Sequence, residues 1–221
     1  MYLSSIVSLL PELNEAFFET LLMVGIGLLV ALVVGMPLGI VLYVTDRGLF
    51  LEKQTVKVVV GMIVNLIRSI PFIILLVFLL PFTDFILGTT IGPLAASVSL
   101  SVAAIPFYAR IVEAAAREID RGVIEAAVAV GASPWMIIKD IILPEAKPGF
   151  ISGLTITAIS LIGYSAMAGT VGGGGIGDLA IRYGYYRYDD TVMFTTVIVL
   201  IVLVQLVQYI GDFIAKSVNK R

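Results

Sequence analysis

Five long apolar stretches dominate the sequence and limit what the chain can fold into. A helix needs about 20 predominantly apolar residues to cross the hydrocarbon core of a bilayer. The chain is 59% hydrophobic and only 14% charged over 221 residues, which is too much apolar surface for one soluble core. We therefore predict an all-α integral membrane protein with five transmembrane helices and short cytoplasmic helices, the spans covering 21–45, 58–82, 91–109, 150–170 and 191–211.

The Lys and Arg residues predict how these spans are oriented, because positively charged loops stay in the cytoplasm. Eleven of the 14 basic residues follow the first, third or fifth span, namely Arg47, Lys53, Lys57, Arg110, Arg117, Arg121, Lys139, Lys147, Lys216, Lys220 and Arg221. The sequence thus predicts an extracytoplasmic N-terminus and a cytoplasmic C-terminus. The largest cytoplasmic loop covers 120–146, and 1–221 is expected to form a single membrane domain.

The composition excludes several classes of function. The chain contains no Cys and no His, so thiol nucleophiles, histidine bases and the usual zinc ligands are ruled out, and we expect no catalytic and no metal site. A net charge of −2 without a basic run argues against nucleic-acid binding. The glycines of "GGGGIG" match a dinucleotide fingerprint only literally, because they follow a membrane span rather than a strand. We expect an external turn there.

The loop at 120–146 carries signals for two short helices. Asp120 can cap the first helix, and Gly131 can end it in the left-handed conformation. Ser133 can cap a second helix that begins at Pro134 and is expected to close at Leu143-Pro144. Such a pair could simply lie on the lipid headgroups, or it could dock on a partner.

The spacing of residues within this loop resembles a known motif. Glu125-Ala126-Ala127 is followed by three residues, Gly131, nine residues, Ile141, one residue and Leu143-Pro144. This pattern resembles the EAA loop of bacterial ABC importer permeases, which sits in a groove on the ATPase subunit. The resemblance implies that Glu125, Ala126, Ala127, Gly131, Ser133, Leu143 and Pro144 couple this chain to an ATPase.

Three further segments resemble the permease of the methionine ABC importer: "RSIPFIILL", "LIGYSAMAGTVGGGGIGDLA" and "YGYYRYDDTVM". Permeases for polar amino acids usually have Gly-Thr-Pro where this chain has Ser69-Ile70-Pro71, although import of another amino acid stays an alternative. The resemblance implies a homodimer in the bacterial inner membrane, with two ATP-binding subunits and an extracytoplasmic substrate-binding protein as partners. Since no Gly-Lys pair exists for a P-loop, ATP and Mg²⁺ are expected on the partner ATPase, with no cofactor in this chain.

The fourth span contains a candidate gate. Small residues surround Met167 in "GYSAMAGTVG", and they would allow close helix packing. Alternatively, Met167 from each copy closes the path, because its flexible thioether can fill a gap and then swing aside. Tyr164 and Ser165 are the other residues that we assign to the path.

Arg68 interrupts the second span, and because a charge inside the membrane is costly, we take a functional role for it as one hypothesis. The favoured alternative is that the span begins near Arg68, whose side chain then reaches the cytoplasmic headgroups. In the first span, Gly27, Ala31, Gly35 and Gly39 form a strip for close helix contact, within the chain or between copies. External acidic residues such as Asp178 are expected to face water.

Two other classes of function compete with an ABC permease. An ion-coupled transporter would ordinarily place acidic groups or broken helices at mid-membrane, and the expected spans contain no acidic residue. An intramembrane hydrolase lacks the required His, Cys or acidic pair.

Overall fold

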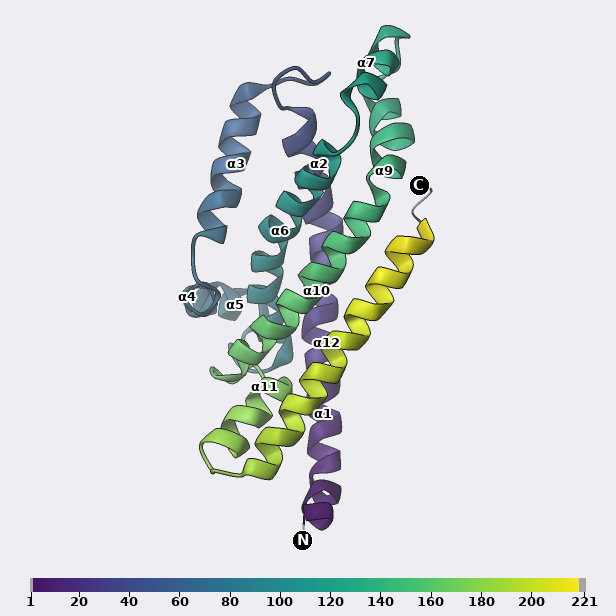
Figure 1. Ribbon diagram of the computed structural model, residues 1–221. Helices are drawn as coiled ribbons and strands as arrows, with labels where there is room; N and C mark the ends of the chain where they lie inside the picture. The colour runs from purple at the N-terminus through teal and green to yellow at the C-terminus, as the bar shows by residue number, and fades with distance from the viewer. Residues whose placement is uncertain (1, 219–221) are drawn as a thin grey trace.

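The computed structural model describes residues 2–218, and every regular element among them is a helix. The helices form an elongated bundle with the N-terminus at one end and α7 at the other (Figure 1). Lys220 and Arg221 lie outside the described residues. The elements are α1 (Tyr2–Val30), η1 (Ala31–Gly35), α2 (Met36–Val44), α3 (Gln54–Arg68), α4 (Phe72–Phe78), α5 (Leu80–Leu87), α6 (Pro93–Arg117), α7 (Arg121–Ala129), α8 (Pro134–Met136), η2 (Ile137–Ile142), α9 (Leu143–Glu145), α10 (Lys147–Gly169), α11 (Gly175–Leu179), η3 (Ala180–Tyr185) and α12 (Asp190–Val218).

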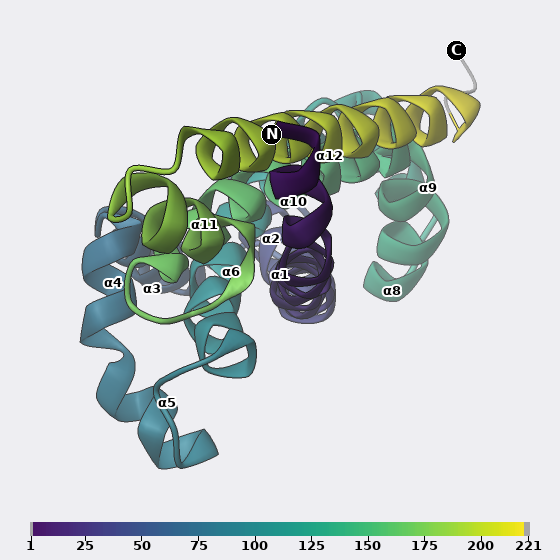
Figure 2. The ribbon, with the colours of Figure 1, turned by 90° about the horizontal axis from the view of Figure 1, so that it is seen from below.

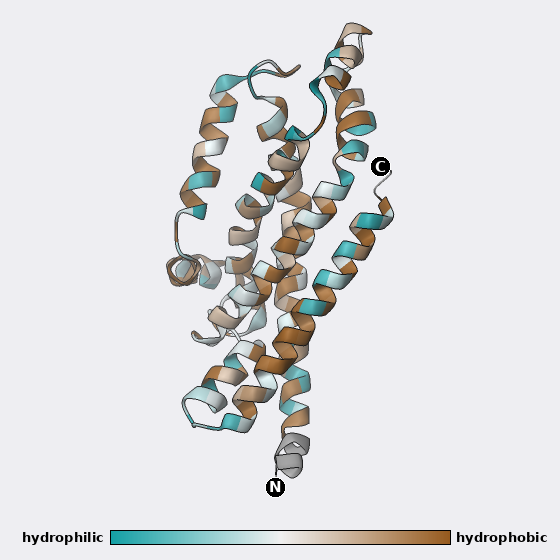
Figure 3. Ribbon diagram, in the orientation of Figure 1, coloured by the Kyte–Doolittle hydropathy of each residue, from teal (hydrophilic) through white to brown (hydrophobic). Residues whose placement is uncertain are grey.

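Four of the expected spans are single helices long and apolar enough to cross a membrane. They cover Leu9–Val44, Pro93–Arg117, Lys147–Gly169 and Asp190–Val218. The first begins well before residue 21, because α1, η1 and α2 form one continuous helix. The outer face of α12 exposes Ile198, Ile201 and Tyr209, and hydrophobic residues dominate its middle turns (Figure 3). Such a face is suited to lipid contact.

The second expected span is bent rather than straight. Helices α3 and α4 meet at 99° across Ser69-Ile70-Pro71, and α5 continues sideways from there (Figures 1 and 2). Pro71 has an extended backbone and lacks the amide hydrogen that would continue the helix. Helix α3 begins at Gln54 and Arg68 is its last residue, so Arg68 lies at the bend between α3 and α4.

Helix α6 is the centre of the bundle and contacts α1, α2, α3, α4, α5 and α10. The small-residue strip of the first span faces this helix. A Cβ atom on Gly35 would lie 2.8 Å from the Ile105 carbonyl oxygen, and one on Gly39 would meet Val112. A Cβ on Gly27 would lie 3.0 Å from the side chain of Leu161 in α10. The strip therefore serves packing within the chain, which decides the question that the sequence left open.

Two π-helical segments end two residues before a proline. In η1, the Met36 amide donates to the Ala31 carbonyl, and Pro37 follows. In η2, the Leu143 amide donates to the Ile138 carbonyl, and Pro144 follows. A proline ring in a regular helix collides with the carbonyl four residues earlier. We attribute both wide turns to this collision, which they relieve while the helix continues.

Candidate functional site

Residues 120–146, here called the coupling loop, form two helices that project beyond the membrane-spanning helices (Figure 1). The Asp120 carboxylate accepts a hydrogen bond from the Gly122 amide at 2.7 Å, which confirms the predicted cap of α7. The Ser133 hydroxyl accepts one from the Met136 amide at 3.3 Å and caps α8, with Pro134 in the first turn. Both helix starts follow the sequence signals.

Gly131 joins the two helices in the predicted left-handed conformation, with φ = +81°. The Gly131 amide donates to the Val128 carbonyl and the Ala132 amide donates to the Ala127 carbonyl, both at 3.0 Å. This pair of bonds is a Schellman motif, and it satisfies the last carbonyls of α7. The turn is therefore fixed by its own hydrogen bonds.

The second loop helix is longer than predicted. Leu143 and Pro144 were expected to close it, but α8, η2 and α9 run on to Glu145, and the chain bends at Ala146. The π turn before Pro144 explains the difference, because it accommodates the proline without ending the helix.

The coupling loop buries a small core and exposes other apolar side chains. Ile124, Ile137 and Ile142 are at most 3% exposed and hold the two helices together. Within the motif, Ala127 and Leu143 are half-buried, whereas Glu125, Ala126, Gly131, Ser133 and Pro144 are exposed. The exposed apolar side chains are those of Val123, Val128, Val130, Trp135 and Met136. Exposed apolar side chains outside the spans make this loop a candidate surface for contact with a partner.

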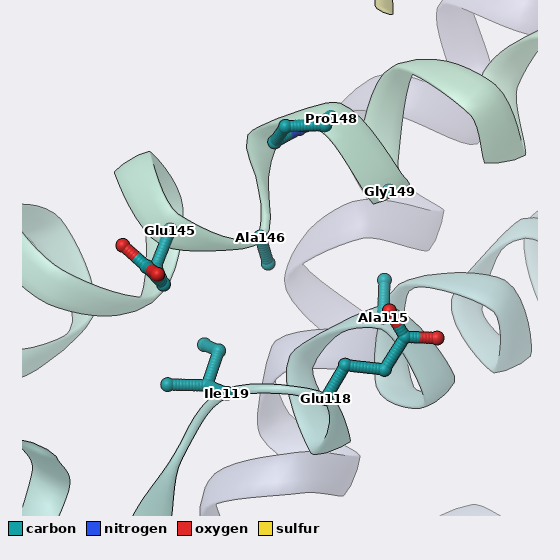
Figure 4. A pocket seen from close by; sticks show the side chains of 7 residues that line it. All are labelled: Ala115, Glu118, Ile119, Glu145, Ala146, Pro148 and Gly149. Atoms are coloured by element: carbon teal, nitrogen blue, oxygen red, sulfur yellow. The ribbon is translucent and has the colours of Figure 1, made fainter. Parts of the chain in front are cut away.

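The two ends of the coupling loop meet at a small cavity of about 180 Å³ between α6 and the start of α10. Figure 4 shows Ala115, Glu118 and Ile119 from the α6 side and Glu145, Ala146 and Gly149 from the other. A Cβ on Gly149 would lie 2.7 Å from that of Ala115, so the two helices approach closely here. The loop is thus mounted on a tightly packed base, through which movement of the loop can reach α6 and α10.

Beside this base lies a cluster of five charged residues, here called the ion cluster, which the sequence interpretation missed. Glu113 is 4% exposed and accepts hydrogen bonds from Lys57, from Arg110 at 2.6 Å and from Arg117 at 2.9 Å. Asp46 pairs with Arg117 and with Lys57. Arg110 also donates to the Gly61 carbonyl at 3.1 Å and to Asn65 at 2.9 Å.

The central carboxylate of the ion cluster lies beyond the expected third span. Glu113 belongs to the helix Pro93–Arg117, four residues after the expected end of that span at residue 109. Three basic side chains surround it, which is the pairing that a buried charge requires. The pKa of Asp46 lies below its ordinary value. Burial alone would raise it, but hydrogen bonds from the Arg47 amide and Arg117, together with the charge of Lys57, outweigh that effect.

Met167, Tyr164 and Ser165 lie in the part of α10 far from the coupling loop. Twenty residues separate Met167 from Lys147, or about 30 Å along the helix. Met167 is 46% exposed on the surface of the single chain, so its side chain is not part of the core of this chain. The Tyr164 ring stacks on Phe72 at 4.4 Å between centroids, and Ser165 is buried and donates to the Ile162 carbonyl. Arg68 is exposed beside the α3–α4 bend.

The glycine-rich segment forms the expected turn, and Glu19 and Thr20 of α1 hold it. The Glu19 carboxylate accepts from the Gly175 amide at 2.7 Å, and the Thr20 hydroxyl accepts from the Ile176 amide at 3.0 Å. Asp178 does not face water as expected, because it is 6% exposed and forms an ion pair with Arg182. That pair raises the pKa of Arg182.

Comparison with known proteins gives consistent matches along nearly the whole chain. Residues 35–221 match the family model described as "Binding-protein-dependent transport system inner membrane component". The probable D-methionine transport system permease protein MetI of Vibrio cholerae is 48% identical over 95% of this chain and 93% of its own length. The methionine import system permease protein MetP of Bacillus subtilis is 46% identical over 96% of both chains.

A solved structure also matches. A chain of the MetNI methionine ABC transporter, in an inward-facing conformation, superimposes with a TM-score of 0.95 and 46% identity. The match covers 96% of this chain and 99% of that one.

Proposed function

This chain belongs to the family of binding-protein-dependent transport system inner membrane components, and from that premise we propose that it is the permease subunit of an ATP-driven importer for D- and/or L-methionine. The observation that carries the proposal is the 46–48% identity to methionine permeases, spread over more than nine tenths of each chain. The protein is a multi-pass component of the bacterial cytoplasmic membrane.

In this proposal the coupling loop docks on an ATP-binding subunit. The exposed Val130 and Trp135 would be covered by that subunit, and Glu125 would offer it a carboxylate. ATP and Mg²⁺ would bind to the two ATP-binding subunits, because this chain has no Gly-Lys pair for a P-loop. Opening and closing of those subunits would move the paired loops and their bases.

A second copy of this chain completes the pathway. One face of α10 is exposed along Ile156, Gly163 and Met167, and a Cβ on Gly163 would meet no atom within 4 Å. Two such faces can approach closely across a dimer axis, since small residues allow close helix contact in lipid. Met167 of each copy would then close the path near Tyr164 and Ser165.

The orientation follows from the Lys and Arg distribution, with the N-terminus outside and the coupling loop and C-terminus in the cytoplasm. A substrate-binding protein would then deliver methionine at the end of the bundle that carries the glycine-rich turn. Cysteine substitutions of Tyr186, which is 69% exposed just after η3, and of the exposed Ser133, in a chain without native Cys, should react with an impermeant reagent from opposite faces. Labelling of Ser133→Cys from outside intact cells would contradict this orientation.

The decisive experiment is uptake of radiolabelled methionine by proteoliposomes that contain this chain, its ATP-binding subunit and its binding protein. We expect uptake with ATP and none without it, independent of a proton or sodium gradient. Uptake driven by an ion gradient without ATP would favour the ion-coupled class. ATP-dependent uptake of another amino acid instead of methionine would change the substrate but keep the class.

A further inference from the structure

One aromatic pair joins the bent second span to the segment of α10 that carries Met167. Phe72 is the first residue of α4, directly after the extended Pro71 at the 99° bend. Its ring stacks on the ring of Tyr164, with 4.4 Å between the centroids and 8° between the ring planes. The bend is therefore connected to α10 through two parallel rings.

The pair lies where the backbone of the second span is interrupted. Pro71 has no amide hydrogen, so the hydrogen-bond pattern of α3 does not continue into α4. Side-chain contacts must then fix the direction of α4 against its neighbours, which are α5, α6 and α10. The ring stack is one of these contacts, and Phe72 is only 7% exposed.

On α10, the stack lies next to the candidate gate residue. Tyr164 precedes Met167 by three residues, and residues at this spacing are neighbours on one face of a helix. Met167 is 46% exposed on the surface of the single chain. Phe72 thus contacts the side chain beside Met167 while its own ring stays inside the bundle.

The backbone of the same segment of α10 is held by α11. A Cβ atom on Gly177 would lie 2.2 Å from the Cα of Ala166, and one on Gly169 would lie 2.3 Å from the Asp178 amide nitrogen. These two helices approach at backbone distance and cannot slide without collision. Aromatic rings, in contrast, attract each other in offset arrangements too. The ring stack is therefore the contact that can adjust when the bent span moves.

We propose that Phe72 is a positioning residue of the gate, whose ring holds Tyr164 and with it the turn of α10 that carries Met167. The inference rests on the proposed function, because it takes Met167 as the residue that closes the path. Movement of the bent second span would then reach Met167 through the two rings. Closure of the path would depend on that span as well as on α10.

The test is ATP-independent leak of radiolabelled methionine through proteoliposomes that contain this chain and its ATP-binding subunit. Phe72→Leu keeps an apolar side chain but removes the ring, and it should raise the leak a few-fold. Phe72→Tyr keeps the ring and should restore the parental leak. Phe78→Leu is the matched control, because Phe78 ends the same helix and is 72% exposed, and it should not leak.

A second background shows whether Phe72 acts through the gate. In Met167→Ala, the further change Phe72→Leu should add no leak, because two changes that impair the same closure are not additive. Fully additive leaks would overturn the proposal, and so would a leak in Phe72→Tyr equal to that of Phe72→Leu. If Phe72→Leu fails to assemble, Phe72→Met replaces it in both backgrounds, since its flexible side chain fills an irregular gap.

A role of Phe72 in packing alone would give a different result. Phe72→Leu would then have a lower unfolding temperature but a parental leak, which would overturn the positioning role. A Met167→Ala variant that does not leak would also overturn it, because no gate would remain to be positioned. In both cases, intact ATP-dependent uptake of methionine by the parent would leave the proposed function standing.

Discussion

The coupling loop and the ion cluster are neighbours at one end of the molecule, but the loop exposes apolar side chains whereas the cluster buries charged ones. The loop presents Val130 and Trp135 to solvent at 84% and 66% exposure. Three residues before the loop, Arg117 belongs to a cluster whose central carboxylate is 4% exposed. Exposed apolar groups indicate contacts with another molecule, whereas buried charges must find their partners within the chain. The comparison separates residues that serve assembly from residues that hold this chain together.

The largest effect is expected at the centre of the ion cluster. Glu113→Gln removes the charge that compensates Lys57, Arg110 and Arg117, and should lower the free energy of unfolding by about 3–5 kcal/mol. Thermal unfolding of the purified permease in detergent measures this. The control is Glu118→Gln, an exposed carboxylate just beyond α6, which should change stability by less than about 0.5 kcal/mol. Equal unfolding temperatures of the Glu113→Gln and Glu118→Gln variants would contradict a stabilising role for the buried charges of the ion cluster.

The next effect is expected on transport rather than on stability. Gly131→Val places a β-branched residue at φ = +81°, which should distort the turn between the loop helices at a cost of about 1–3 kcal/mol. ATP-dependent uptake should fall strongly while the membrane helices stay folded, as circular dichroism can check. Gly131→Asn should retain most activity, because Asn tolerates this conformation. Uptake at the parental rate by the Val variant would rule out a coupling role for the turn.

Removing one exposed aromatic side chain sharpens the same contrast. Trp135→Ala should leave the unfolding temperature of the isolated permease unchanged but weaken its binding to the ATP-binding subunit about tenfold or more. Surface plasmon resonance with immobilised permease can follow this. Tyr209→Ala, 73% exposed on α12, is the control and should alter neither quantity. A stability loss in Trp135→Ala would mean that the loop needs this side chain for its own fold.

Met167 extends the comparison to an exposed apolar residue inside the membrane region. Met167→Ala should leave stability unchanged and raise ATP-independent leak of methionine a few-fold in proteoliposomes, because a smaller side chain closes the path less well. Ile198→Ala on α12, which is 59% exposed, should not leak. If the two variants behave alike, Met167 contributes only packing between copies.

The smallest effect concerns the pH dependence of the ion cluster. Because the folded-state pKa of Asp46 is depressed, its carboxylate contributes stability above its unfolded-state pKa and loses that contribution as pH falls through the folded value. The difference in unfolding temperature between the parent and Asp46→Asn should therefore shrink between neutral pH and pH 3. A difference that stays constant over this range would show that Asp46 acts through packing and not through charge.

The two regions also differ in how far the sequence predicted them. Asp120, Gly131 and Ser133 act on backbone groups within a few residues, so local patterns predicted their positions correctly. The ion cluster joins Asp46 and Lys57 to residues more than 50 positions later, which no local pattern reveals. One signal was available, since Arg110, Glu113 and Arg117 follow helical spacing, but the third span was expected to end at residue 109.

The effect of each proline on its helix is the other feature that the sequence did not fully predict. Pro71 lies within the expected second span, and the chain bends there by 99° instead of continuing as a straight helix. Pro144 was expected to close a helix, yet the helix passes it after a wide turn. The two outcomes differ because of the backbone at each proline. The backbone at Pro71 is extended, so the helix ends there. The backbone before Pro144 already forms the wider π-type hydrogen bond, which leaves room for the proline ring. Sequence alone does not tell a helix end from a π turn.

The π turn at Ala31–Gly35 absorbs one extra residue within the longest helix. Because a π turn holds about one residue more than an α turn, the helix before and after it keeps nearly the rotational phase of an uninterrupted helix. Glu19 and Thr20 therefore face the glycine turn while Gly35 and Gly39 face α6. Deleting one residue inside the turn would keep that phase but restore the collision between the Pro37 ring and the preceding turn. A residue inserted without such a turn would instead rotate one end of the helix by about 100° relative to the other.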